Sequence, residues 1–397
     1  MCHPAMRAFS LPLTFSPMDS ALQSLAERIR AAAAEKKLLR IRGGASKDFY
    51  GQTLQGEVLN TQDFQGIVSH EPSELVVTVR AGTPLAALES VLAAQGQCLP
   101  FEPPHFGSGA TVGGMVASGL AGPARASTGS VRDYVLGARL LNGKAEDLYF
   151  GGQVMKNVAG YDVSRLLAGS WGTLGLITEV SLKVLPKAPA EATLVCAGIA
   201  QQAALDLLHH WGGQPLPLNA SAWLHDTSAS PSEDFLFVRL RGAVAAVESA
   251  MSRMSTDAQA QGARVSCMDN TQAAADWRAS GEQTLPFFKP PSDESCLWRL
   301  SLPQTAPALE LTYAQYIEWQ GAQRWLWAPV SAADALREVA QHAGGHATLF
   351  RASRQGGEQD KTVGVHTPLN PVQLGIQRAL QQQFDPHGVF ATGRMGF

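Results

Sequence analysis

The chain has 397 residues, enough for two or three domains, and 45% of them are hydrophobic, which allows a sizeable core. Its formal net charge is −3 with only 16% charged residues, so the charge pattern argues against a nucleic-acid partner. The cysteines have neither metal nor cluster spacing, which disfavours zinc sites, iron–sulfur clusters and a disulfide scaffold and fits a reducing cytosol; they are Cys2, Cys98, Cys196, Cys267 and Cys296.

Residues 1–18 are predicted to form a loose N-terminal leader. Pro4, Pro12 and Pro17 interrupt it, and it lacks the unbroken apolar segment of a signal peptide. No apolar run in the chain approaches the roughly 20 residues that a membrane-spanning helix needs. We therefore expect a cytoplasmic protein without a transmembrane segment.

The first half of the chain alternates helix and strand patterns. Apolar residues three and four positions apart predict a helix from about residue 19 to Lys37, and a short strand, Leu38–Ile41, follows. A second strand, Glu74–Ala81, runs into a helix for which Thr83 is the expected N-cap and Pro84 the first helical residue.

A hairpin and one more strand complete this half. Strands Val135–Leu141 and Asp147–Phe150 flank Asn142-Gly143, a pair typical of a type I′ turn. The long strand Leu176–Leu185 then leads to Pro186 and Pro189, which mark a domain boundary. We place the first domain at residues 19–188.

The stretch from residue 103 to residue 137 is dominated by glycine and small residues. Glycine lets the backbone come close to a ligand, and exposed backbone N–H groups suit a flat or anionic one. A flexible linker is the alternative, but the apolar segments TVGG and YVLGARLL are not typical of linkers. Its glycines are Gly107, Gly109, Gly113, Gly114, Gly119, Gly122, Gly129 and Gly137.

A second glycine turn, Arg42–Lys47 (RGGASK), follows the strand Leu38–Ile41. Successive backbone N–H groups in such a turn form an anion-binding nest, although an ordinary tight turn explains this pattern alone equally well. The basic residues at its two ends either offset the charge of an anion or are solvated. Neither a Rossmann G-x-G-x-x-G between strand and helix nor a P-loop is present.

After Pro189 the composition changes, because the glycine clusters thin out and most of the tryptophans lie here. Alternating helix and strand patterns predict a separate α+β domain at residues 189–383. Residues 384–397 (FDPHGVFATGRMGF) form a tail predicted to return to the first domain, with Arg394 tying it there.

These motifs together resemble the FAD-binding family typified by vanillyl-alcohol oxidase and p-cresol methylhydroxylase (PCMH), and within it the FAD-binding E subunits of glycolate oxidases. The resemblance rests on RGGASK, TVGGMVASGLAG with the following TGS, GTLGLIT and the terminal DPHGVFATGR. It covers Leu38–Leu185 and the tail Phe384–Gly396 and is much weaker between them. It implies an α+β fold: a PCMH-type FAD-binding domain of two subdomains, followed by a smaller α+β cap domain.

The resemblance also implies where FAD binds. RGGASK corresponds to the pyrophosphate loop, TVGGMVASGLAG wraps the isoalloxazine ring and ribityl chain, and GTLGLIT lies nearer the adenine. The turn lacks the histidine that often carries covalent flavin in this family, so non-covalent FAD is implied. The implied cofactor contacts are Arg42, Gly43, Gly44, Ala45, Ser46, Lys47, Pro104, Gly107, Thr111, Gly113, Gly114, Ala117, Ser118, Gly122, Gly129, Val135, Gly172, Gly175 and Ile177.

The sequence assigns no catalytic residue and no metal ligand. His342 and His346 are four residues apart, but Gly344 and Gly345 between them disfavour a helix that would hold a metal. His105, the one histidine within the glycine-rich stretch, is a candidate polar contact near the flavin ring. The turn KNVAGYD (156–162) is interpreted as capping and turn residues.

The implied function is that of an FAD-dependent oxidoreductase subunit in a multi-subunit glycolate (2-hydroxy acid) oxidase. Its partners would be a related catalytic flavoprotein subunit and an iron–sulfur subunit, and the small 2-hydroxy acid would be the substrate of the whole complex, which could lie peripherally on the inner face of the membrane. A stand-alone FAD-dependent 2-hydroxy acid dehydrogenase, such as a D-lactate dehydrogenase, and a non-catalytic scaffold remain alternatives. A stand-alone dehydrogenase needs a catalytic base and residues that bind the substrate carboxylate, which the sequence does not reveal. The intact glycine clusters argue against a scaffold that binds no flavin.

Overall fold

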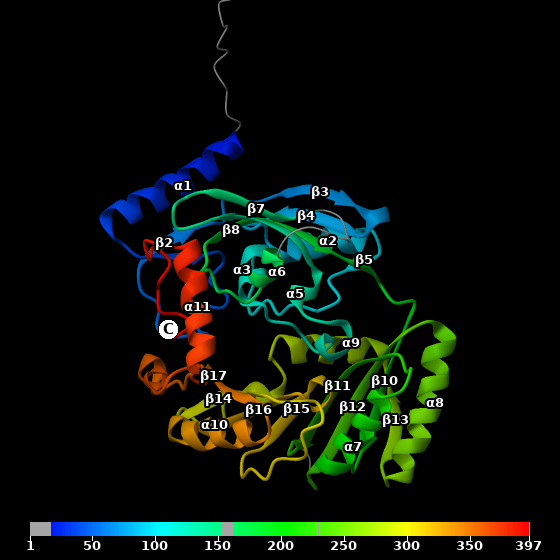
Figure 1. Cartoon of the computed structure of the whole chain (residues 1–397). Helices are drawn as coiled ribbons and strands as arrows, with labels where there is room; N and C mark the ends of the chain where they lie inside the picture. Colours follow the sequence, from blue (N-terminus) through cyan, green and yellow to red (C-terminus); the bar gives the residue numbers. More distant parts are fainter. Residues whose placement is uncertain (1–16, 153–161, 229, 397) are drawn as a thin grey trace, which may run out of the picture.

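The computed structural model describes residues 17–152, 162–228 and 230–396. Figure 1 shows two sheets, one in the upper half of the view below helix α1 (Pro17–Glu35) and a larger one in the lower half. Helix α11 (Pro371–Phe384) runs along one side between them and returns the chain to the upper half. The α+β fold class predicted from the sequence is confirmed.

The upper sheet is antiparallel throughout, with the strand order β3-β4-β8-β6-β7. A separate pair of parallel strands, β1 and β2, lies beside this sheet. The strands of this half are β1 Leu39–Arg42, β2 Glu57–Asn60, β3 Ile67–Glu71, β4 Val76–Arg80, β5 Gln97–Cys98, β6 Val135–Leu141, β7 Asp147–Gly151, β8 Leu176–Lys183 and β9 Leu185–Pro186. Its short helices are α2 Leu85–Ala94, α3 Val112–Ser118, α4 Arg125–Thr128, α5 Val131–Tyr134 and α6 Val163–Leu166.

The lower sheet is also antiparallel, with the order β13-β10-β12-β11-β15-β16-β14-β17. Its strands are β10 Ala190–Ala197, β11 Leu218–Asp226, β12 Glu233–Gly242, β13 Arg264–Met268, β14 Ser295–Ser301, β15 Gln315–Glu318, β16 Gln323–Pro329 and β17 His346–Arg351. Its helices are α7 Gln201–Gly212, α8 Val244–Ala260, α9 Asn270–Gly281 and α10 Ala333–His342.

The two faces of the lower sheet bury different kinds of residue. On one face Leu236 and Val238 pack in a core with residues of α7 and α8, and Trp298 packs in a second core with residues of α10. On the other face Trp325 and Phe350 pack with residues of α9 and with aromatic residues of the first half of the chain. This second face therefore joins the two sheets.

Two local predictions were wrong. Thr83 does not cap α2: the N-cap is Pro84, and the Thr83 hydroxyl accepts a hydrogen bond from the Gly66 N–H at 2.9 Å. The β6–β7 hairpin has a loop of residues 142–146 instead of a type I′ pair, with its left-handed residue at Ala145 (φ 56°). Gly143 is required for another reason, because a Cβ there would lie 2.0 Å from Asp385 Oδ1.

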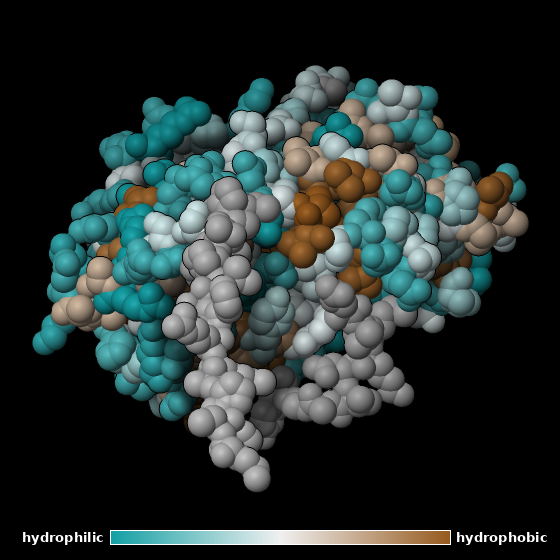
Figure 2. Space-filling view, turned by 90° about the horizontal axis from the view of Figure 1, so that it is seen from above, coloured by the Kyte–Doolittle hydropathy of each residue, from teal (hydrophilic) through white to brown (hydrophobic). Residues whose placement is uncertain are grey.

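The first helix and the tail share one core. Helix α1 begins at Pro17, two residues before the predicted start, and buries Ile29 against a cluster that includes Phe390. The division into 1–18, 19–188, 189–383 and 384–397 is retained as a proposal. Seen from above Figure 1, the surface is mostly hydrophilic, with hydrophobic residues gathered near its centre (Figure 2).

We expect Phe390→Ala to lower the free energy of unfolding by about 3–5 kcal/mol, because it removes a fully buried ring from the core formed with α1 and β1. Val372→Ala, at a side chain that is 72% exposed, should change it by less than about 0.5 kcal/mol. Guanidinium unfolding followed by circular dichroism measures both. Equal effects of the two substitutions would contradict the buried position of the tail.

Candidate functional site

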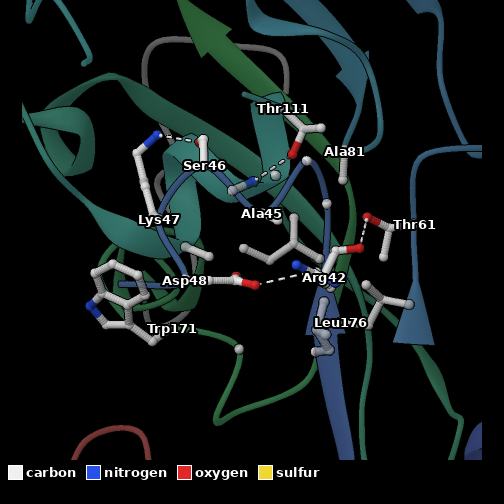
Figure 3. Close-up of a pocket in the computed structure, with 18 of the residues that line it drawn as sticks. Arg42, Ala45, Ser46, Lys47, Asp48, Thr61, Ala81, Thr111, Trp171 and Leu176 are labelled. Carbon is white, nitrogen blue, oxygen red and sulfur yellow. Dashed lines mark hydrogen bonds and ion pairs between the residues drawn. The ribbon is translucent and has the colours of Figure 1, made fainter. Parts of the chain in front are cut away.

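A cavity lies where the Arg42–Lys47 turn, at the end of β1, meets the N-terminus of α3 (Figure 3). We call it the turn cavity. The start of β8 and residues 171–175 close its other side. Thr111 is the N-cap of α3, and its hydroxyl accepts a hydrogen bond from the Gly114 N–H at 3.2 Å. Two glycine-containing segments far apart in the sequence thus form one site.

The glycines at this junction have two different roles. A Cβ on Gly44 would lie 1.4 Å from the Gly109 carbonyl oxygen, and one on Gly113 would lie 2.6 Å from the Ala81 Cβ. These glycines therefore allow the backbone segments to touch. At Gly114, by contrast, the nearest atom to a Cβ would be Thr111 Oγ1, at 3.1 Å, so a side chain there would extend toward the cavity.

The backbone of the Arg42–Lys47 turn offers free donors. The N–H groups of Gly44, Ala45 and Ser46 make no backbone hydrogen bond to any other described residue. Ala45 has a left-handed φ of 61°, which changes the direction in which successive N–H groups point. This is the arrangement of an anion-binding nest.

Positive charge predominates in the lining. Lys47 is only 7% exposed, and its ammonium donates to Ser46 Oγ at 3.3 Å and to the His105 carbonyl at 3.2 Å. Burial lowers the pKa of Lys47 to about 8. Arg42 pairs at 2.8 Å with Asp48, the one carboxylate among the described residues of the lining.

Arg394 reaches the same cavity from the C-terminal tail. It donates to the carbonyls of Lys47 and Tyr50 and lies 4.3 Å from the centre of the Trp171 ring. Its Nε atom is buried and has no hydrogen-bond partner among the described residues. Burial lowers the pKa of Arg394 to about 10. The prediction that Arg394 ties the tail to the first half is confirmed.

Most of the predicted contacts line the turn cavity, namely Arg42, Gly43, Gly44, Ala45, Ser46, Lys47, Thr111, Gly113, Gly114, Ala117, Gly172, Gly175 and Ile177. The remaining predicted contacts do not. Pro104, Gly107 and Gly122 line two other cavities, and Val135 is buried in the core of the upper sheet. Ser118 donates its hydroxyl to the Met115 carbonyl, and Gly129 ends α4 at a φ of 94°.

Several lining residues were missed by the sequence analysis: Ile41, Asp48, Thr61, Ala81, Trp171 and Leu176. Asp48 and Trp171 adjoin predicted motifs, so widening those motifs by one residue would have found them. Thr61 and Ala81 carry no such signal, because only the folded strands place them beside the turn.

None of the described residues that line the turn cavity is a histidine. His105 Nε2 is 2.9 Å from Glu89 Oε2, and this hydrogen bond raises its pKa. In the described part of the chain no three histidine, cysteine or acidic side chains gather as a metal site. Of the turn 156–162 only Asp162 is described; it caps α6 as predicted, whereas Lys156–Tyr161 lie outside the described residues. None of the helices described is long and apolar enough to cross a membrane.

Comparisons with known proteins place this chain in a family. Residues 20–148 match the FAD binding domain family. The chain is 42% identical over 373 residues to the glycolate oxidase subunit GlcE of Escherichia coli (strain K12), an alignment that covers 94% of this chain and 97% of that subunit. The chain is thus an FAD-binding oxidoreductase of α+β fold. The chain belongs to the GlcE family of glycolate oxidase subunits, so the family resemblance is confirmed.

More distant relatives share only part of the chain. The glycolate oxidase subunit GlcD of Bacillus subtilis (strain 168) is 30% identical over 172 residues, which is 42% of this chain and 36% of that subunit. A D-lactate dehydrogenase of Archaeoglobus fulgidus is 34% identical over 136 residues, covering 34% and 30% of the two chains. An alkyldihydroxyacetonephosphate synthase has the same fold with a TM-score of 0.66 at 13% identity, covering 92% of this chain and 74% of that one.

We expect Gly114→Val to reduce bound FAD at least tenfold, because its side chain would extend into the turn cavity. Gly213→Val is the matched control, since a Cβ there would meet nothing closer than 3.8 Å and Gly213 has a φ of −84°. Acid-released flavin per polypeptide is the measurement. Equal flavin content in the two variants would show that FAD does not use this cavity.

The affinity for FAD should fall as the pH rises through about 8, the pKa of Lys47. An anion bound beside Lys47 raises its pKa, so binding takes up a proton above pH 8 and the Kd increases by up to about tenfold per pH unit. Lys47→Met should bind FAD more weakly at pH 7 and lose this dependence, whereas Lys144→Met, at an exposed lysine, should retain it. Fluorescence titrations between pH 6.5 and 9.5 measure it; a constant wild-type Kd would refute the role of Lys47.

Proposed function

We propose that FAD binds in the turn cavity with its pyrophosphate against the Arg42–Lys47 turn. The observation that carries this proposal is the set of free N–H groups at Gly44, Ala45 and Ser46 beside the buried Lys47. Among the described residues of the lining, three are cations and one is a carboxylate, so an anion with two negative charges, such as a pyrophosphate, balances them. Arg394 Nε supplies one further unused donor.

The proposed binding places the rest of FAD along the lining. Thr111, Gly113, Gly114 and Ala117 of the α3 region lie beside the ribityl chain, and Gly172, Gly175 and Ile177 lie nearer the adenine. No histidine or cysteine is among the described residues that line the cavity, which supports non-covalent binding. The remaining predicted contacts could reach only parts of FAD that extend beyond this cavity.

When bound, FAD supplies two-electron oxidation and transfer of single electrons to a further carrier. The chain's own residues hold the cofactor and balance its charge. Lys47 keeps its proton only while an anion lies beside it or the pH is below about 8. Trp171 lies against Arg394 on one side of the cavity.

We propose further that this chain is the FAD-binding subunit of a multi-subunit glycolate oxidase and passes electrons through its flavin toward an iron–sulfur subunit. A related flavoprotein subunit would oxidise the 2-hydroxy acid. The support is the match to GlcE, itself named as a subunit, over nearly the whole length of both chains. In this proposal the complex is cytoplasmic and lies peripherally on the inner face of the membrane.

We expect the isolated, FAD-loaded chain to oxidise glycolate or D-lactate at less than about 1% of the rate of the assembled complex. The reason is that the described lining of the turn cavity offers an anion cradle and only one carboxylate, itself ion-paired, as a base. Dye reduction with and without co-expressed partner subunits measures this. Full turnover by the chain alone would favour the stand-alone dehydrogenase, and a chain without flavin would favour the scaffold.

A further inference from the structure

Glu282, the residue that follows α9, binds the backbone of the glycine-rich stretch. Its Oε1 accepts a hydrogen bond from the His105 N–H and its Oε2 accepts one from the Phe106 N–H, each at 2.8 Å. Hydrogen bonds from backbone N–H groups to a carboxylate are charge-assisted and stronger than those between neutral groups. We call this contact the Glu282 clamp. It joins the part of the chain that forms the lower sheet to the part that forms the upper one.

The clamp holds a backbone conformation that Phe106 adopts only at a cost. Phe106 has a left-handed φ of 53°, and this conformation is unfavourable for a bulky side chain. Such a conformation persists only where the surrounding structure fixes it. The hydrogen bond from the Phe106 N–H to Glu282 is a restraint of this kind. Without it we expect residues 105–106 to relax toward an ordinary conformation.

Glu282 is itself held in place from two sides. Its own N–H donates to the carbonyls of Arg278 and Ser280 at the end of α9. The next residue, Gln283, has a left-handed φ of 54°, and its side-chain oxygen accepts hydrogen bonds from the Arg351 guanidinium at 3.0 and 3.3 Å. Because Arg351 ends β17, the clamp is tied to the lower sheet.

The two clamped residues also surround the Lys47 side chain. The Lys47 ammonium donates to the His105 carbonyl at 3.2 Å and lies 5.6 Å from the centre of the Phe106 ring. Its other hydrogen bond, to Ser46 Oγ, lies within its own turn (Figure 3). Glu282, residues 105–106 and Lys47 therefore form a continuous series of contacts from the lower sheet to the turn cavity.

The charge of Glu282 acts on Lys47 as well. Burial lowers the pKa of Lys47 to about 8, and the negative charge of Glu282 opposes this effect. The clamp thus favours the protonated ammonium. The other charged or titratable groups around Lys47 are the Arg42–Asp48 pair of its own turn, Arg394 of the tail, Arg351 of β17, and His105, whose ring pairs with Glu89 of α2.

We propose that Glu282 is a positioning residue for Lys47, through which the lower sheet determines how tightly the turn cavity binds an anion. The clamp holds His105 and Phe106 against the Lys47 side chain, and these two residues hold its ammonium at the cavity. This inference rests on the proposed function, in which the pyrophosphate of FAD is the anion. A chain with a broken clamp keeps the Arg42–Lys47 turn and its free N–H groups but loses the placement of Lys47.

The test is a fluorescence titration of the full-length chain with FAD between pH 6.5 and 9.5. Glu282→Gln removes the negative charge and one of the two acceptors, so Lys47 loses its proton at a lower pH. The rise of the Kd with pH should begin at least about 0.5 pH unit lower than in the wild type, which makes the Kd at pH 8 at least about threefold higher. Glu294→Gln is the matched control, because Glu294 is an exposed acid of the same half of the chain, and its profile should be that of the wild type.

Two further variants separate positioning from a merely structural contact. Glu282→Asp keeps the charge, so the rise of its Kd should begin near the wild-type pH. In the Lys47→Met background Glu282→Gln should change the Kd for FAD by less than about twofold, since its effect acts through Lys47. Circular dichroism verifies that each variant folds.

The outcomes for Glu282 and for the FAD site are distinguishable. An unchanged pH profile in folded Glu282→Gln, or an equal weakening of FAD binding with and without Lys47, would overturn the role of Glu282 and leave the proposed FAD site standing. If Lys47→Met alone binds FAD as tightly as the wild type, the proposed site fails, and this inference fails with it.

Discussion

The turn cavity depends on the contact between two glycine-containing backbone segments. Gly44 and Gly109 lie so close that a side chain on Gly44 would overlap the main chain of the other segment. This contact directs the unpaired N–H groups of the Arg42–Lys47 turn along the rim of the turn cavity. A sequence with alanine at these positions would keep the hydrophobic pattern of both strands and lose the site between them.

The lower sheet holds the other end of the glycine-rich stretch. Arg239 and Arg241 of β12 both pair with Glu102, at 2.7 and 2.5 Å, and the Ala124 N–H donates to the same carboxylate. Burial alone would raise the pKa of Glu102, but the two arginines hold it below its usual value. Arg239 is only 2% exposed, whereas Glu102 is 24% and Arg241 30% exposed, so the network is partly buried. Strand β12 of the lower sheet therefore fixes the residues that flank the glycine-rich stretch.

The sequence predicted those lining residues of the turn cavity that belong to short, local motifs. Arg42–Lys47 and Thr111–Ala117 are short segments whose glycines and N-cap identify them without the rest of the chain. Pro104 and Gly107 were assigned to the same site because they belong to the same glycine-rich stretch. They line another cavity, and the residues between them, His105 and Phe106, donate their N–H groups to the Glu282 carboxylate at 2.8 Å each. That partner lies about 176 residues away, and no local pattern announces it.

Tertiary contacts that local patterns do not reveal also limited the predictions of secondary structure and of the tail. Periodicity predicted the positions of strands and helices. The predicted type I′ turn was wrong, because Gly143 is needed for its close contact with Asp385 and the Asn-Gly pair does not reveal that tertiary contact. Arg394 was predicted to tie the tail, yet its position on Trp171 at the turn cavity depends on folding of the whole chain.

The polar face of the lower sheet is less favourable for stability than an apolar face would be. An apolar face would pack against the first half more favourably, as the opposite face does against α7, α8 and α10. Part of the polarity is explained by contacts that fix the glycine-rich stretch, for example Trp319 donating to the Gly122 carbonyl at 2.9 Å. Arg299 and Glu318 make no such contact with the backbone of that stretch. Arg299 instead donates to the Tyr50 hydroxyl at 2.9 Å, so a buried polar contact also joins this face of the sheet to the segment that follows the Arg42–Lys47 turn.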